Sequence, residues 1–149
     1  MRRTGRRRAK TYAFIGHDFT TRAGRKTKFR KSVASALKNF SFIPHYADTG
    51  REHSAVLKDI TKKIEASEFC IFDLTGYKKK RKLGKNLNVI LELGISIGLK
   101  KPAFVAYKER SIDFDKEFSD FLGEYRYPYK THKELKQNIK DYITSLLKA

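Results

Sequence analysis

The sequence predicts an α/β domain in which a parallel five-stranded sheet carries helices on both faces. Short apolar runs alternate with segments of helical periodicity along almost the whole chain. One run, Phe69–Leu74 (FCIFDL), is almost continuously apolar, which is typical of a strand buried on both sides of a sheet. The 149 residues are 40% apolar and include 11 Phe and 8 Tyr, enough for one domain with its own core.

The first half of the chain supplies three of the expected strands. Its helices show apolar residues three and four positions apart, and the second begins with a capping serine, Ser54. Pro44 makes the start of the second strand less regular. In order, we expect a strand at Tyr12–Gly16, a helix at Thr27–Phe40, a strand at Phe42–Tyr46, a helix at Ser54–Ser67 and the strand Phe69–Leu74.

The second half repeats this alternation. We expect Asn88 to cap a helix that runs to about Lys100, and Gly94 and Gly98 to let that helix pack tightly on the sheet. The remaining elements are a strand at Pro102–Tyr107, a short helix at Phe114–Leu122, a weak edge strand at Tyr125–Tyr129 and a helix at His132–Leu147.

This alternation favours the flavodoxin-like strand order 2-1-3-4-5. In that order a ligand binds at the carboxyl ends of strands one and three, where the winding of the chain reverses. The segments Gly16–Lys26 and Thr75–Leu87 would face each other there.

The net charge of +18 is concentrated in three segments without acidic residues. Met1–Lys10, Arg22–Lys31 and Lys78–Lys85 each hold six basic residues, and the rest of the chain is balanced. Residues 1–10 are therefore interpreted as a basic tail and residues 11–149 as the domain. Such patches attract nucleotide phosphates or nucleic acid, although they also serve solubility.

Several classes of protein are excluded by composition. A single cysteine, Cys70, cannot form a disulfide framework or a Cys-rich zinc site, and no cluster has metal-ligand spacing. The longest apolar stretch, Val89–Leu99, contains a glutamate and is too short to cross a bilayer. No apolar segment follows the basic start, so we expect a cytoplasmic protein without a membrane partner. We also expect no bound cofactor and no metal.

Glu92 is the most informative residue, because it is the only charge in the apolar helix segment VILELGISIGL. A lone carboxylate there is costly unless it is paired or used, so it is either catalytic or salt-bridged to a lysine. Asn88 and Ser96 should share its helix face. Asp73 ends the third strand and either binds substrate or braces a loop, and His17 is either a substrate contact or a hydrogen-bonded loop residue. Cys70 is expected in the core.

Three motifs together resemble a known superfamily. They are YAFIGHDF, the segment Ile60–Gly76 ending in ASEFCIFDLTG, and NLNVILELGISIGLKKP at Asn86–Pro102. The chain resembles the Toll/interleukin-receptor (TIR) superfamily over residues 11 to 147. It is most similar to bacterial TIR-like nucleotide-binding proteins related to nucleoside 2-deoxyribosyltransferases, whose later Phe-Asp would be Phe114–Asp115. Leu87 replaces the usual proline, Tyr77–Lys85 is a basic insert, and the chain has no Trp.

The resemblance implies that Glu92 is catalytic and that the enzyme cleaves an N-glycosidic bond, commonly that of NAD, in signalling or antiviral defence. It also implies activation by self-association. The expected substrate-binding residues are Gly16, His17, Asp18, Asp73, Thr75, Gly76, Asn86 and Asn88. The expected phosphate or polyanion contacts are Arg22, Arg25, Lys26, Lys78, Lys79, Lys80, Arg81 and Lys82.

Three functions stay open on the sequence. The first is an enzyme that cleaves NAD or a related nucleotide. The second is a non-catalytic module that binds nucleic acid or signals through its basic patches, although no sequence-specific DNA- or RNA-binding motif is present. The third is a nucleoside deoxyribosyltransferase that uses the same glutamate as nucleophile.

Overall fold

The computed structural model describes residues 9–18, 23–47, 56–79, 82–84, 87–112 and 126–149. Within them, five parallel strands form one sheet in the order β2-β1-β3-β6-β7. This confirms the predicted order 2-1-3-4-5. The strands are β1 (Thr11–Gly16), β2 (Phe42–Tyr46), β3 (Phe69–Asp73), β6 (Ala103–Lys108) and β7 (Arg126–Tyr129).

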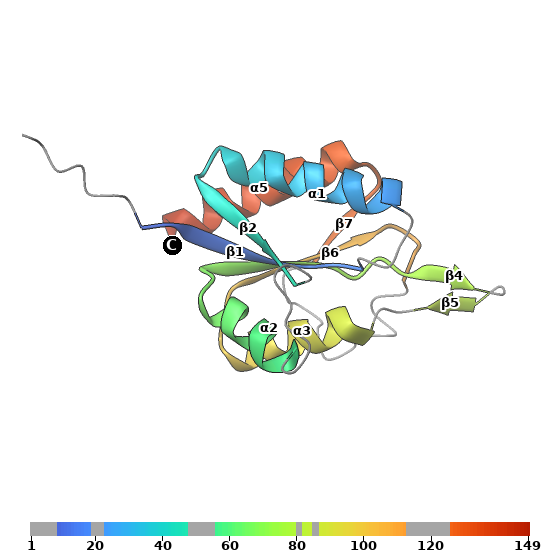
Figure 1. The fold of residues 1–149 in the computed structure, drawn as a ribbon. Coiled ribbons are helices and arrows are strands. Elements are labelled where there is room, and N and C mark those ends of the chain that lie inside the picture. The colour runs from blue at the N-terminus through green and yellow to red at the C-terminus, as the bar shows by residue number, and fades with distance from the viewer. Residues whose placement is uncertain (1–8, 19–22, 48–55, 80–81, 85–86, 113–125) are drawn as a thin grey trace, which may run out of the picture.

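Two layers of helices cover the sheet (Figure 1). Helices α1 (Ala23–Lys38) and α5 (His132–Lys148) pack together on one face, and α2 (Val56–Glu65) and α3 (Leu87–Gly98) pack together on the other. Parallel strands need such crossover helices, and right-handed crossovers place them on both faces. The architecture is therefore the three-layer α/β fold that the sequence predicts.

The central strands carry apolar residues on both of their faces because both faces of the sheet are covered. In β3, Phe69 and Ile71 belong to the core under α1 and α5, whereas Cys70 and Phe72 belong to the core under α2 and α3. In β1, Ile15 and Phe14 divide in the same way. Successive side chains of a strand point to opposite faces, and both faces of this sheet are buried. This explains why FCIFDL does not alternate between apolar and polar residues.

Proline occurs only in the edge strands of this sheet as described. Pro44 lies in β2, which pairs with β1 alone, and Pro128 lies in β7, which pairs with β6 alone. An edge strand has one side that needs no ladder hydrogen bond, so a residue without an N–H is tolerated there. The predicted strand at Phe42–Tyr46 is confirmed despite its proline.

Several predicted boundaries change. Helix α1 begins at Ala23, four residues before Thr27, and α3 begins at Leu87, so Asn88 is a helical residue and not the cap. The expected β6 is shifted by one residue to Ala103–Lys108. The predicted capping residue Ser54 and the predicted helix Phe114–Leu122 lie outside the described residues.

The expectation for Gly94 and Gly98 is wrong. Both glycines are exposed, and a Cβ atom built on either would meet nothing within 4 Å. Helix α3 instead packs against the sheet through the opposite face, which carries Val89, Glu92, Leu93 and Ser96. The glycines therefore face away from the sheet.

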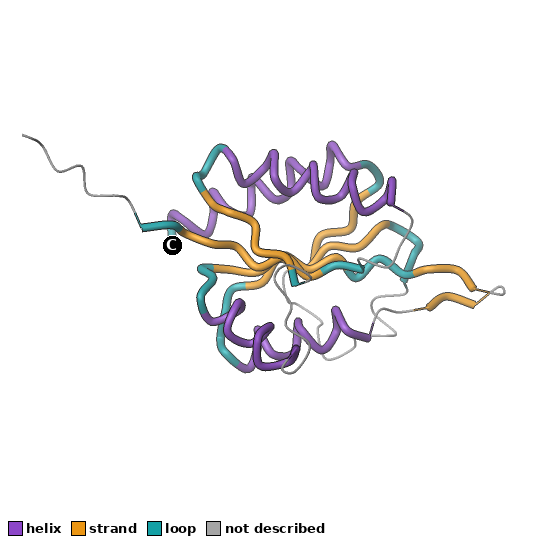
Figure 2. Tube along the Cα trace, in the orientation of Figure 1, coloured by secondary structure: helices purple, strands orange, loops and turns teal. Residues whose placement is uncertain are grey.

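The basic insert contains an antiparallel hairpin that the sequence analysis treats only as a longer loop. Strands β4 (Tyr77–Lys79) and β5 (Lys82–Gly84) pair with Lys79 opposite Lys82. The hairpin follows β3 and projects beyond the body of the domain (Figure 2).

Candidate active site at the carboxyl ends of the central strands

Glu92 is buried where helix α3 passes the sheet. It lies on the helix face that packs against β1, β3 and β6, and 4% of its surface is exposed. Its neighbours along the same face, Val89 and Leu93, are core residues. The apolar pattern of VILELGISIGL therefore turns the single carboxylate toward the sheet and not toward solvent.

The position of the Glu92 carboxylate follows from its short distance to Gly16. Gly16 is the last residue of β1, and a Cβ atom on it would lie 2.7 Å from Glu92 Oε2 and 2.6 Å from Phe72 Cδ1. Real Cβ atoms essentially never approach other atoms so closely. The sequence predicts that Gly16 lets the backbone approach a ligand; in the structure it is Glu92 and Phe72 that approach it. The Glu92 carboxylate thus lies against the carboxyl end of β1.

His17 follows Gly16, and protein atoms contact both of its ring nitrogens. Arg30 Nε donates to Nε2 at 2.9 Å, and Nδ1 lies 3.2 Å from the carbonyl oxygen of Asp18. Because a guanidinium can only donate, Nε2 is an acceptor, and the neutral ring carries its hydrogen on Nδ1. With 6% of its surface exposed, His17 has the geometry of a hydrogen-bonded loop residue.

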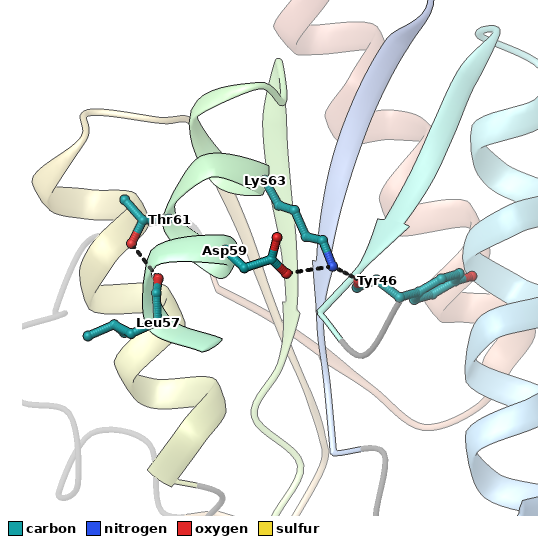
Figure 3. A network of polar contacts seen from close by, with 5 residues as sticks. All are labelled: Tyr46, Leu57, Asp59, Thr61 and Lys63. Atoms are coloured by element: carbon teal, nitrogen blue, oxygen red, sulfur yellow. Dashed lines mark hydrogen bonds and ion pairs between the residues drawn. The ribbon is translucent and has the colours of Figure 1, made fainter. Parts of the chain in front are cut away.

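The carboxyl end of β2 is held by two helices. The guanidinium carbon of Arg30, on α1, lies 4.0 Å from the centre of the Tyr46 ring. From the other face, Lys63 on α2 donates to the Tyr46 carbonyl oxygen at 3.4 Å and pairs with Asp59 at 3.2 Å (Figure 3). Lys63 is itself 7% exposed, so this anchor lies inside the domain.

Asp73 belongs to a polar network that joins the ends of β3, β6 and β7. Its Oδ1 accepts from the Thr75 backbone at 3.0 Å and from the Thr75 hydroxyl, and its Oδ2 accepts from the Tyr129 hydroxyl at 3.2 Å. The Lys108 backbone N–H donates to the Thr75 hydroxyl at 3.0 Å, and the Gly76 N–H donates to Ser111 Oγ at 3.3 Å. These bonds give Asp73 and Thr75 the geometry of loop-bracing groups.

The remaining predicted site residues divide into three groups. Ser96 is fully buried on the same face of α3 as Glu92, and its hydroxyl donates to the Leu93 carbonyl at 2.7 Å, whereas Asn88 is exposed and does not share that buried face. Arg25 and Lys26 lie in the first turn of α1, and Lys78, Lys79 and Lys82 lie in the β4–β5 hairpin. Asn86, Arg22, Lys80 and Arg81 lie outside the described residues.

The structure also gives the position of the expected core cysteine and bears on metal-binding clusters and membrane-spanning helices. Cys70 is fully buried, and its burial raises the pKa of the thiol to about 12. In the described ranges, no three His, Cys, Asp or Glu side chains gather into a group that could hold a metal ion. Across the same ranges, every helix is too short or too polar to cross a membrane.

A family model described as "CAP12/Pycsar effector protein, TIR domain" matches residues 14–131. The chain belongs to this TIR-domain family. The match spans most of the domain, including the carboxyl end of β1 with Gly16 and the helix that carries Glu92. The resemblance inferred from the three sequence motifs is thereby confirmed.

Solved structures share the fold of this TIR domain at low sequence identity. A CMP N-glycosidase from Clostridium botulinum has a TM-score of 0.63 and 11% identity over 89% of this chain and 99% of that one. A 2-desoxiribosyltransferase from Leishmania mexicana has a TM-score of 0.57 and 14% identity over 73% and 71%. A conserved protein from Enterococcus faecalis V583 has a TM-score of 0.56 and 13% identity over 90% and 99%. Comparison with curated proteins gave no match.

Three residues at this end of the sheet are missing from the sequence-based site: Arg30, Tyr46 and Tyr129. Arg30 lies in a predicted basic segment and directly follows the buried Phe29, which is a signal that it borders the packed face of its helix. The two tyrosines end predicted strands, where ligand-facing groups commonly lie. Nothing in the local sequence pairs them with His17 or Asp73.

Proposed function

We propose that this TIR domain is an enzyme that cleaves the N-glycosidic bond of NAD or a related nucleotide, and that Glu92 is its catalytic carboxylate. The observation that carries the proposal is the position of Glu92, which is 4% exposed and packed against Gly16 at the carboxyl end of β1. Ligands of doubly wound sheets bind at this end, where the strand order reverses between β1 and β3. A buried carboxylate here is poised for a cationic reaction centre.

The chemistry requires one carboxylate and no metal-bound water. When the bond between nicotinamide and ribose breaks, the bonding electrons leave with the ring, which becomes neutral, and positive charge develops on the anomeric carbon and ring oxygen of the ribose. Glu92 would stabilise this charge or attack the anomeric carbon, and water would complete hydrolysis to ADP-ribose with release of one proton. Because nicotinamide leaves as a neutral molecule, no strong general acid is needed.

The family and the fold support this proposal. The family description places the domain in effector proteins, which is in keeping with a role in signalling or defence. Two of the similar structures are named as a CMP N-glycosidase and a 2-desoxiribosyltransferase, and the first name denotes the kind of bond cleavage proposed here. A transferase would use the same carboxylate and differ in the final acceptor, a second base in place of water.

The test is base release by the purified protein and by Glu92→Gln, which removes the charge with little change in shape. NAD, CMP and a panel of nucleosides are incubated with each, with and without an added acceptor base, and products are separated by liquid chromatography. We expect Glu92→Gln to lose at least about 100-fold in rate, as is typical when an electrostatic group at the reacting centre is removed. The exposed Glu68 provides the matched control, Glu68→Gln, which should keep full activity.

The outcomes separate the three functions. Base exchange in place of hydrolysis would assign a deoxyribosyltransferase. A wild-type protein that releases no base from any substrate but binds nucleic acid would assign a non-catalytic module. Near-full activity of Glu92→Gln would overturn the mechanism, whereas loss of its folded circular-dichroism spectrum would indicate that the carboxylate is structural.

A further inference from the structure

Helix α3 exposes an apolar face on the side away from the sheet. Leu87 is 73% exposed and Leu91 is 54% exposed, and Ile97 is exposed on the same helix. The only charged residue of α3, Glu92, is buried against the sheet. The outer face of α3 is therefore uncharged, in a chain in which 34% of the residues are charged. Exposed apolar surface of this kind commonly marks a place where another molecule binds.

This outer face has a raised half and a flat half. One stripe along the helix is formed by residues that follow at intervals of four, three and four positions: Leu87, Leu91, Gly94 and Gly98. The first half of the stripe carries two leucine side chains. The second half carries none, and a Cβ atom built on either glycine would meet nothing within 4 Å. Another molecule can therefore approach the backbone of α3 closely at the glycines.

The stripe is complementary to itself when two copies of the helix run antiparallel. A two-fold axis that crosses α3 midway between Leu91 and Gly94 places Leu91 of one copy opposite Gly94 of the second copy. The same axis places Leu87 opposite Gly98, and each contact occurs twice. Every leucine then packs on a position without a Cβ atom. An interface of two identical patches requires such self-complementarity, whereas a surface for a different partner does not.

Charge also favours α3 over the other described helices as the place where two copies meet. Each of the others exposes lysines, among them Lys31 on α1, Lys62 on α2 and Lys133 on α5. Two copies that met through those helices would bring like charges together, which is unfavourable. Pairing through the outer face of α3 brings no charged side chain of either helix into contact. In a chain with a net charge of +18, this face therefore offers the least repulsive contact among the described helices.

We infer that α3 is a dimerisation surface on which a second copy of this chain packs antiparallel about a two-fold axis, with the leucines of each copy against the glycines of the other. The family resemblance implies self-association in general, and the structure assigns it one surface and a closed symmetry. The inference goes beyond the proposed cleavage and does not depend on it, because Glu92 lies on the opposite side of the helix. One helix pair, with the exposed Leu57 of the neighbouring α2, makes a small interface, so we expect a dissociation constant on the order of micromolar.

The experiment measures self-association by sedimentation equilibrium at protein concentrations from about 0.1 to 500 μM, a range that brackets the expected constant. Leu91→Lys places a charge in the middle of the stripe, and Gly94→Leu fills its flat half. The double variant Leu91→Gly/Gly94→Leu exchanges the two residues, so that each leucine again faces a glycine. The matched control is Leu147→Lys, which makes the same change at a 60% exposed leucine of α5, on the other face of the sheet.

We expect the wild type to form dimers and no larger species, because a two-fold interface uses the same patch on both copies. Leu91→Lys should raise the Kd by at least about 30-fold, as is typical when a central interface residue is lost. Gly94→Leu should also weaken the dimer, although it adds apolar surface, because two leucines then meet. The double variant should recover most of the affinity, and Leu147→Lys should match the wild type.

Salt dependence gives an independent readout. Sodium chloride screens the repulsion between two copies that each carry a charge of +18, so pairing through an uncharged face should strengthen as salt is raised. An interface made of ion pairs would weaken under the same conditions, and that result would contradict the α3 surface. Circular dichroism confirms that each variant is folded. Below the Kd the chain is a monomer, so substitutions on this face then act on the helix alone.

Three results would overturn the inference. The first is a wild type that stays monomeric at the highest concentration, which would leave the outer face of α3 to a partner of different sequence. The second is association that Leu91→Lys and Leu147→Lys weaken equally, since the interface would then lie elsewhere. The third is tighter association of Gly94→Leu than of the wild type, which would indicate unspecific apolar adhesion and not the two-fold packing of leucine on glycine.

Discussion

The substitution Gly16→Ala tests directly whether Glu92 depends on its close contact with the end of β1. The new Cβ atom would lie 2.7 Å from Glu92 Oε2 and 2.6 and 2.8 Å from two ring carbons of Phe72. The φ angle of Gly16 lies outside the left-handed region, so alanine meets no backbone strain there and the perturbation comes from these contacts. Because Phe72 is fully buried in the core, the carboxylate must take up part of the displacement.

The substitution should lower both the stability of the domain and the rate of the reaction. Inserting a methyl group into a packed interior costs about 1–3 kcal/mol of unfolding free energy. For a domain of this size that corresponds to a fall in Tm of roughly 2–12 °C. A misplacement of a catalytic group by about 1 Å costs on the order of 100-fold in rate, equivalent to about 2.7 kcal/mol in the activation barrier.

The assay is kcat/KM for base release at a temperature well below the Tm of the variant, with circular dichroism to confirm folding. Gly94→Ala is the matched control, because it makes the same chemical change on α3 where the added Cβ meets nothing within 4 Å. In the Glu92→Gln background, Gly16→Ala should cause no further loss of rate. If Gly16→Ala alone keeps kcat/KM within twofold and does not lower the Tm, the inferred contact between Gly16 and Glu92 is refuted.

Two further predictions concern stability. Gly94→Ala should raise the free energy of unfolding by about 1 kcal/mol, because alanine is the best helix former and its Cβ atom meets no other atom at this exposed position. Denaturant unfolding measures this change, and a loss of stability would contradict the prediction. For His45, burial and then the nearby Lys63 lower the pKa of the imidazole below its usual 6.5, while Asp59 opposes them. The unfolded chain therefore takes up a proton near pH 6.5 that the folded chain takes up only at lower pH, so stability falls as the pH drops below about 6.5. Melting curves from pH 7.5 to 5.5 should show a steeper fall in Tm for the wild type than for His45→Gln, and parallel curves would contradict this.

The two-sided burial of the sheet followed from sequence because it depends on a local pattern, and the strand order followed from the alternation of strands and helices. The run FCIFDL predicts a strand covered on both faces, and Phe69–Asp73 forms the centre of the sheet. Glu92 was found for a similar reason, since a single charge in an apolar helix is visible in the sequence itself. Its catalytic role stays a prediction, whereas its burial is a finding of the structure.

The errors of sequence analysis arose where a local pattern has two structural solutions. Glycines four residues apart share a helix face, but their spacing does not indicate whether that face meets the sheet or solvent. Gly94 and Gly98 face solvent because the larger apolar side chains of Val89 and Leu93 occupy the side of the helix that meets the sheet. Asn88 is a good capping residue by type, but α3 begins at Leu87. Propensity is overridden at such positions by the packing of the whole helix.

The sequence by itself predicted the fold class, the strand order and a lone carboxylate near the carboxyl ends of the strands, because hydrophobic periodicity and the winding of parallel strands are readable along the chain. Only the tertiary structure decided which groups meet there. Gly16 and Glu92 are far apart in sequence, as are His17 and Arg30, or Asp73 and Tyr129, and each pair is joined across different elements. Such contacts depend on strand register and on the rotation of each helix against the sheet, which are set by the packing of both cores together and not by any local run of residues.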